Sequence, residues 1–174
     1  YEEASKSPLI IYDPRLPRAH AGAVRQAITA NVDMAATIHA LAGVPAPAGS
    51  DGRNLLPLLT NPAARVRDAL PLFNFWGVPS AQSLAIVAPG WKYIHWHYGG
   101  DGMKPTEELF HLAADPHEMT NLAGDLRHTA QLATFRRQFD AELAAIPKAL
   151  APGESRTTRR RECHRRRPRS RTRR

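Results

Sequence analysis

Apolar residues form short runs along the chain, and the spacing within each run predicts a different element. The first run, "PLIIY" at residues 8–12, begins with a proline, is soon followed by another, and contains two adjacent Ile residues. Continuous apolar runs of this length are typical of strands that are covered on both faces of a sheet. We therefore expect a buried strand at residues 8–12, paired with neighbouring strands.

The second apolar segment has the spacing of a short helix. In "NVDMAATIHALAGVP", four and then three residues separate Met34, Ile38 and Leu41. Asp33 is an N-cap candidate, and Gly43 stands where a left-handed residue commonly ends a helix. A short helix is expected between these two residues, and the following "DGRNLLPLLTNP" predicts a turn and a brief helical or irregular segment.

Residues from about 70 to 112 have the pattern of an antiparallel meander. The segments "LPLFNFWG", "QSLAIVA" and "WKYIHWHY" are short, rich in aromatic and β-branched residues and separated by turns, and a fourth strand is expected around Leu109 to Leu112. Strand alternation in "WKYIHWHY" places two sets of side chains on opposite faces, namely Trp91, Tyr93, His95 and His97 on one and Lys92, Ile94, Trp96 and Tyr98 on the other. Neither face is purely polar, so both should be covered.

The last apolar stripe predicts an amphipathic helix from about residue 127 to 146. Its members are spaced three, four, four and three residues apart, and they are Leu132, Phe135, Phe139, Leu143 and Ile146. The order of elements indicates an α/β protein that ends in a smaller α+β subdomain. We expect three regions: the end of an α/β core at 1–65, an α+β subdomain at 66–150 and a disordered tail at 151–174.

The positive charge of the chain is concentrated in the tail. The net charge is +8, whereas residues 151–174 alone contain eleven Arg and two Glu, so residues 1–150 are close to neutral. Such a tail could bind nucleic acid or another polyanion by counterion release, but Arg without Lys is also what a shifted reading frame in GC-rich DNA gives. Both explanations stay open. The only cysteine, Cys163, lies here, so a disulfide or CxxC metal site within one chain is excluded.

No apolar stretch approaches the length of a membrane span, and the first twenty residues contain prolines and charges where a signal peptide needs a continuous apolar segment. We expect no membrane partner, and the sequence does not indicate a compartment.

Candidate chemical groups are few. The adjacent carboxylates Glu2/Glu3 and Glu107/Glu108 should point to opposite faces of extended backbone, so neither pair converges. His95 and His97 share a strand face at a spacing that occurs in metal sites, but no third ligand follows at a recognisable interval. The residues predict a fold without a complete active site.

Several segments, in order and in register, resemble the C-terminal portion of type I sulfatases, in particular arylsulfatase-like and N-sulfoglucosamine sulfohydrolase-like members. They are "YEEASKSPLIIYDPR", "NVDMAATIHALAGVPAPAGSDGRNLLPLL", "WKYIHWHY" and "EELFHLAADPHEMTNL". The resemblance covers about residues 1–146 and excludes the tail. It implies the C-terminal part of an alkaline-phosphatase-like α/β fold, with a subdomain made of a small antiparallel sheet and a helix.

The resemblance also implies chemistry. Type I sulfatases hydrolyse sulfate esters or sulfamates with a formylglycine, made from the Cys or Ser of a C/S-x-P-x-R motif, beside a divalent cation that is usually calcium. Cys163 does not match, because Arg165 stands where the motif needs proline. The family's nucleophile, metal ligands and catalytic Lys and His would precede Tyr1, so no catalytic or metal-binding residue is assigned to this chain and no cofactor is expected to bind it alone.

Within the matching segments, the resemblance implies that Tyr1, Glu2, Glu3 and Pro8 belong to the stretch that leads from the active-site rim into a core strand. The resemblance implies that His95, Trp96 and His97 border the substrate, which would be a sulfated small molecule or glycan. The sequence therefore predicts the C-terminal portion of a sulfatase, a hydrolase by family that is inactive in isolation; relatives are commonly periplasmic, secreted or lysosomal. The alternative is a non-enzymatic interaction module whose Arg-rich tail binds nucleic acid or a sulfated polysaccharide.

Overall fold

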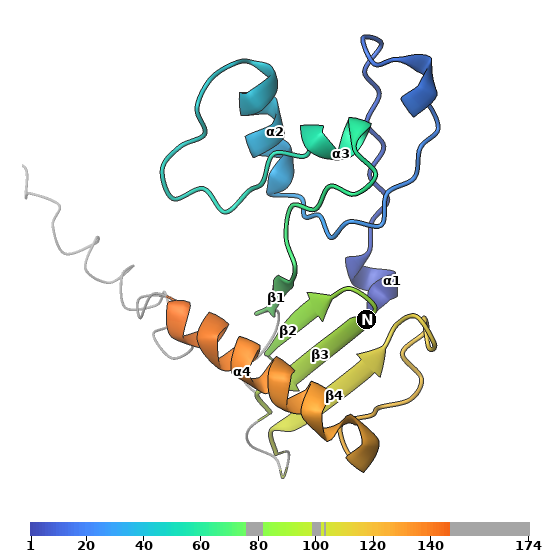
Figure 1. Ribbon diagram of the computed structural model, residues 1–174. Helices are drawn as coiled ribbons and strands as arrows, with labels where there is room; N and C mark the ends of the chain where they lie inside the picture. Colours follow the sequence, from blue (N-terminus) through green and yellow to red (C-terminus); the bar gives the residue numbers. More distant parts are fainter. Residues whose placement is uncertain (76–81, 99–101, 103, 147–174) are drawn as a thin grey trace, which may run out of the picture.

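The protein folds around a four-stranded antiparallel sheet with a long helix packed across one face (Figure 1). The computed structural model describes residues 1–75, 82–98, 102 and 104–146. Its elements in chain order are α1 (Glu2–Ser5), η1 (Arg18–His20), α2 (Asp33–Leu41), α3 (Leu56–Thr60), β1 (Leu70–Asn74), β2 (Ser83–Ala88), β3 (Trp91–Trp96), β4 (Thr106–His111), η3 (Leu126–His128) and α4 (Thr129–Ala145). The predicted tail at 151–174 lies outside the described residues.

The sheet confirms the predicted meander. Its strand order is β1-β2-β3-β4 and every neighbouring pair is antiparallel. Strands β2 and β3 are joined by a two-residue turn in which Gly90 has a φ of 75°, a backbone conformation that favours glycine. Strand β4 begins earlier than expected, at Thr106. Because every connection is a local hairpin, the sheet can form from neighbouring segments of the chain.

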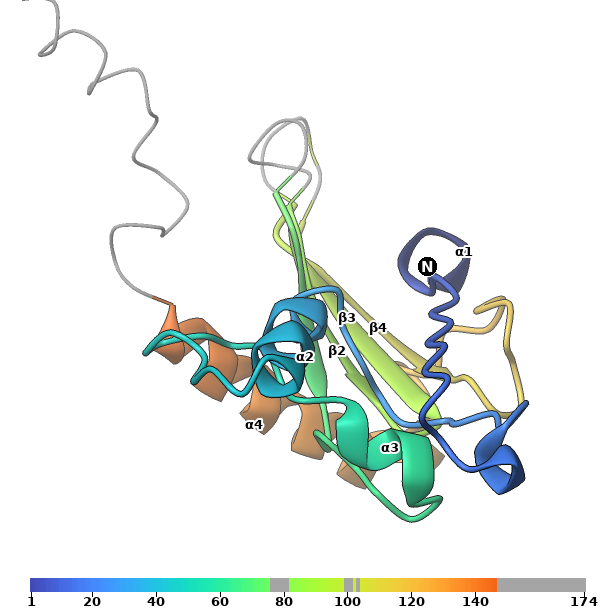
Figure 2. The same cartoon turned by 90° about the horizontal axis from the view of Figure 1, so that it is seen from above.

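Helix α4 closes the main hydrophobic core against one face of the sheet. Figure 2 shows α4 on one side of the sheet and α1 on the other. The core contains Leu84, Ile86, Tyr93, Leu109, Leu132, Phe135 and Phe139. Each of these large side chains contributes about 1.5–3 kcal/mol when fully buried. The predicted helix and the first three members of its stripe are thus confirmed, whereas Leu143 is 40% exposed.

The strand predicted at residues 8–12 is wrong. This segment is irregular, and Ile10 and Tyr12 are 90% and 85% exposed. Its apolar pattern is that of a strand, but burial also needs partner strands, and all four strands of the described sheet pair only with one another. Residues 8–12 therefore have the composition of a buried strand, but the described part of the chain provides no strand that pairs with them.

Helix α2 confirms the predicted helix, and Gly43 follows it with a φ of 66°. The prediction of Asp33 as N-cap is wrong, because Val32 occupies that position. Asp33 is instead completely buried, where its carboxylate accepts the main-chain N–H groups of Ala30 at 2.7 Å and Arg53 at 2.8 Å. The Arg67 guanidinium pairs with the same carboxylate. Asp33 thus joins α2 to the segments before and after it.

The apolar stripe of α2 is largely exposed to solvent. Met34, Ile38 and Leu41 are 48%, 64% and 49% exposed, and the buried side of the helix carries Ala36 and Thr37. The brief helical segment after α2 is confirmed as α3, which has Pro57 in its first turn. No described helix has the length and apolar character to cross a membrane. The division at residue 65 stays a prediction.

Candidate functional site

The three predicted substrate-binding residues at the end of β3 do not lie on one face of the sheet. His95 and His97 face α4, and their rings lie 4.8 and 5.9 Å from the ring of the buried Phe139. Trp96 points to the opposite face, where it packs with the cluster that contains Ile94. The alternation predicted from the sequence is confirmed, and it separates Trp96 from the two histidines. Their role in substrate binding stays a prediction.

On the helix side, polar groups hold α4 against the sheet. Burial and, after it, the charge of His95 lower the pKa of the neighbouring His97, whose ring centroid is 4.6 Å away. Tyr93 donates to Glu107 at 3.1 Å, and Arg136 of α4 pairs with Glu107 at 2.6 Å. Burial raises the pKa of Tyr93, and the charge of Glu107 raises it further. These groups serve mainly the docking of the helix.

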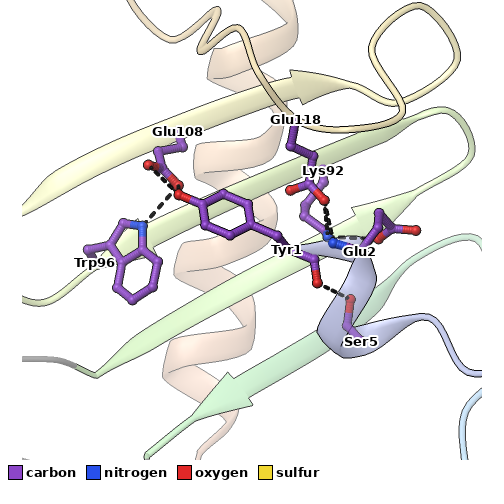
Figure 3. Close-up of polar contacts among 7 residues, drawn as sticks. All are labelled: Tyr1, Glu2, Ser5, Lys92, Trp96, Glu108 and Glu118. Atoms are coloured by element: carbon purple, nitrogen blue, oxygen red, sulfur yellow. Dashed lines mark hydrogen bonds and ion pairs between the residues drawn. The ribbon is translucent and has the colours of Figure 1, made fainter.

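The opposite face carries a cluster of aromatic rings around one carboxylate, which we call the aromatic corner: Tyr1, Trp96, Tyr98 and Glu108. Glu108 accepts the indole N–H of Trp96 at 3.0 Å and the phenol O–H of Tyr1 at 3.3 Å (Figure 3). The rings of Trp96 and Tyr98 stack with centroids 5.3 Å apart and planes 11° from parallel. Burial and the nearby charge of Glu108 raise the pKa of Tyr1. The carboxylate thus fixes two rings of the corner.

Beside the corner, a buried ion-pair triad fastens the first residues to the sheet. Lys92 is 1% exposed, and its ammonium lies 2.7 Å from Glu2 and 3.0 Å from Glu118 (Figure 3). Glu118 also accepts the main-chain N–H of Glu2 at 2.5 Å. One oxygen of Glu118 is buried without a hydrogen-bond partner in the described structure. The side chain of Glu3 lies outside the described part.

Sequence reasoning missed the role of this triad. The available signal was Lys92, because a cation on a strand face predicted to be covered needs a buried carboxylate. Nothing in the sequence indicated Glu118, whose φ of 55° is unusual for a residue other than glycine. The prediction that Glu107 and Glu108 point to opposite faces is confirmed, since Glu107 contacts α4 and Glu108 contacts Tyr1.

The described residues do not fit the divalent metal that the family resemblance implies. Across residues 1–75, 82–98, 102 and 104–146, no three His, Cys, Asp or Glu side chains converge as a metal site. The most deeply buried acid, Asp33, is already engaged by two N–H groups and Arg67. Cys163 lies beyond the described residues. This described part of the chain therefore offers no metal site on which a catalytic step could depend.

Comparison with known proteins relates this chain to sulfatases. The sequence model of the family described as N-sulphoglucosamine sulphohydrolase, C-terminal, matches residues 1–145. Arylsulfatase K of Xenopus laevis is 30% identical over 162 residues, which are 87% of this chain and 28% of that protein. N-acetylglucosamine-6-O-sulfatase of Bacteroides thetaiotaomicron is 34% identical over 130 residues, which are 71% of this chain and 22% of that protein.

A solved structure of a protein in complex with its substrate D-glucosamine-2-N,6-O-disulfate superposes with a TM-score of 0.61 and 25% identity, covering 71% of this chain and 26% of that one. The chain therefore spans about a quarter of the length of these relatives. The expected fold, the C-terminal part of an alkaline-phosphatase-like sulfatase with a small antiparallel sheet and a helix, is confirmed.

Proposed function

We propose that this chain, which belongs to the family of the N-sulphoglucosamine sulphohydrolase C-terminal region, is the C-terminal portion of a sulfatase. The whole protein would hydrolyse sulfate esters or sulfamates of a sulfated sugar. The observation that carries this proposal is the match of the family model over residues 1–145, which includes every described element. The relatives' sugar-sulfate substrates support the substrate class.

In this proposal the nucleophile and the metal come from residues that precede Tyr1 in a longer protein. A formylglycine and a divalent cation, calcium in most of the family, would supply the attacking hydroxyl and stabilise the sulfate oxygens. The residues of this chain would build the wall of the active site and hold it in place. The triad of Lys92, Glu2 and Glu118 fixes the first residues of the chain, which would follow directly from the catalytic region.

The exposed apolar surface of the N-terminal region supports this arrangement. Its large exposed side chains are Leu9, Ile10, Ile11, Tyr12, Val24, Val32, Met34, Ile38, Leu41 and Val44. Large apolar side chains exposed in this number are typical of a region that packs on a partner, and the apolar run at 8–12 has the composition of a strand covered on both faces. The preceding α/β core of a sulfatase would cover this surface and pair with residues 8–12.

The first experiment is an assay of the purified chain, residues 1–174, with an aryl sulfate and with D-glucosamine-2-N,6-O-disulfate. We expect no turnover, because the nucleophile is supplied by preceding residues. Turnover by this chain that a chelator removes would contradict the proposal.

The second experiment is to read the coding DNA upstream of Tyr1. We expect a C/S-x-P-x-R segment, and the joined reading frame should give chelator-sensitive sulfatase activity. Absence of such a segment in every upstream frame would contradict the role in a sulfatase.

The charge of the tail supports a second, non-enzymatic function. Residues 151–174 carry eleven Arg, a density suited to nucleic acid or a sulfated polysaccharide. Binding to heparin or DNA that weakens steeply with salt and disappears on deletion of residues 151–174 would favour this function. Binding that survives the deletion would rule it out.

A further inference from the structure

We propose that the aromatic corner binds an uncharged sugar ring that neighbours the sulfated one, and that His95 and His97 take no part in this contact. The inference rests on the proposed function, since it concerns how the same substrate is held. The contact surface is the ring pair of Trp96 and Tyr98, and the carboxylate of Glu108 excludes sulfate from it.

The geometry of the corner suits a sugar ring. Trp96 and Tyr98 stack almost in parallel, so their facing sides cover each other, and the part of this ring pair that stays exposed is open to a ligand. Aromatic rings offer an apolar face with a polar edge, which matches the apolar face and the hydroxyl rim of a pyranose. Glu108 fixes the indole by accepting its N–H at 3.0 Å. The ring orientation is therefore set before binding, which lowers the entropy lost on association.

The charges around the corner disfavour sulfate. Glu108 accepts hydrogen bonds from the neutral donors of Trp96 and Tyr1, and no cation forms an ion pair with it in the described part of the chain. Beside it, the single positive charge of Lys92 faces two carboxylates, Glu2 and Glu118. Among these groups the three carboxylates outnumber the one ammonium, which disfavours sulfate relative to an uncharged ring.

The histidines are excluded by their position. His95 and His97 lie on the opposite face of the sheet, where they pack against Phe139 of α4. A small ligand on the corner cannot reach them, because the sheet separates the two faces. Tyr1, in contrast, belongs to the corner and begins the segment that the proposed function places directly after the catalytic region.

The test is a titration of the ¹⁵N-labelled chain, residues 1–174, followed by the indole N–H signal of Trp96. The probes are N,N′-diacetylchitobiose, which is uncharged, and N-acetylglucosamine-6-sulfate. We expect the uncharged probe to shift the Trp96 signal with a dissociation constant on the order of 1 mM. The sulfated probe should bind several-fold more weakly. Trp96→Ala should weaken diacetylchitobiose binding at least tenfold, followed then by backbone amide signals, and His97→Ala should change it less than twofold.

Two further variants separate binding from a structural role. Trp96→Phe keeps an aromatic ring and should retain part of the affinity, which covers the case in which Trp96→Ala unfolds the corner. Glu108→Gln keeps an acceptor but removes the charge, so affinity for the sulfated probe should rise several-fold while affinity for diacetylchitobiose changes less than twofold. A purely structural Glu108 would lower both affinities together.

Three results would overturn the inference: no shift of the Trp96 signal by diacetylchitobiose, equal losses in Trp96→Ala and His97→Ala, or no change in the ratio of the two affinities in Glu108→Gln. These outcomes differ from failure of the proposed function. If the joined reading frame hydrolyses sulfated sugars while the corner binds no sugar, the corner is wrong and the sulfatase role stands. If the corner binds diacetylchitobiose but no upstream sulfatase motif exists, sugar binding by the corner stands and the sulfatase role is wrong.

Discussion

The region of the sheet and α4 and the region before the sheet are stabilised in different ways. Around residues 70–145, apolar side chains from the strands and α4 bury one another in a continuous core. Before the sheet, the buried carboxylate of Asp33 joins the segments around α2, and the triad at Lys92 fastens the first residues to the sheet, while apolar side chains such as Ile10 and Ile38 face solvent. The first region buries its apolar side chains in its own core. The second leaves large apolar side chains exposed, and their burial needs a partner that the described residues do not supply.

The comparison agrees with the proposed sulfatase role. A subdomain with a closed core can keep its shape by itself, whereas a region with an open apolar surface is suited to packing on a larger core. The two regions should therefore respond differently when their principal contacts are removed.

Phe135→Ala should have the largest effect on stability. Phe135 is 1% exposed and its ring stacks on Tyr93, so truncation removes packing from both the helix and the sheet. We expect the free energy of unfolding to fall by about 4 kcal/mol, measured by urea denaturation followed by circular dichroism. The matched control is Leu126→Ala, at a side chain that is 89% exposed, with an expected change below about 0.5 kcal/mol. Similar losses in both variants would contradict the closed core.

Asp33→Ala should disrupt only the region before the sheet. The change leaves the guanidinium of Arg67 and the N–H groups of Ala30 and Arg53 without their acceptor, at a local cost of about 3 kcal/mol. Hydrogen exchange should show loss of protection at Ala30 and Arg53 while β3 keeps its protection. Equal loss in β3 would show that the two regions unfold as one unit.

Lys92→Met should release the first residues from the sheet. The variant leaves Glu2 and Glu118 without their cation, and breaking such a buried pair costs about 3 kcal/mol. Limited proteolysis should then cut near α1 faster than in the unmodified chain. The triple variant Lys92→Met, Glu2→Gln, Glu118→Gln removes all three charges and should recover most of the lost stability. Failure to recover would mean that the length of the side chain, not its charge, holds the segment.

Acid should weaken the contact between α4 and the sheet by a smaller amount. The pKa of His97 is lowered in the fold by burial and by His95, so the neutral form is favoured there. This stabilisation is complete above the unfolded pKa of about 6.5 and is lost as the pH falls below it toward the lowered folded pKa. Unfolding free energies measured between pH 7 and pH 5 should therefore fall more in the unmodified chain than in His97→Ala. Parallel pH profiles would contradict the partly buried environment of His97.

The sequence was most informative where neighbouring residues pack on one another. The spacing of Leu132, Phe135 and Phe139 predicted the face of α4 that is buried, because a helix fixes that spacing geometrically. Alternation in β3 correctly predicted the two faces, and it already separated Trp96 from His95 and His97, although the family resemblance grouped them.

The features that the sequence did not predict depend on contacts between segments that are distant in the sequence. Glu118 meets Glu2 across 116 positions, and no local pattern could indicate this pairing. The run at residues 8–12 has the composition of a buried strand, but composition does not provide the partner strands. Local patterns fail in these two cases because a long-range hydrogen bond and a buried strand both depend on residues that lie opposite in the fold.

The central claim is that the region before the sheet presents an apolar surface made to be covered by a sulfatase core, and hydrophobic-dye binding to the folded chain tests it most directly. We predict clear dye fluorescence, or self-association at micromolar concentration, that falls strongly in the variant Ile10→Asn, Ile38→Gln. Because both side chains are exposed, the unfolding free energy should change by less than about 0.5 kcal/mol. A monodisperse monomer that binds no dye and unfolds in one sharp transition would contradict the claim.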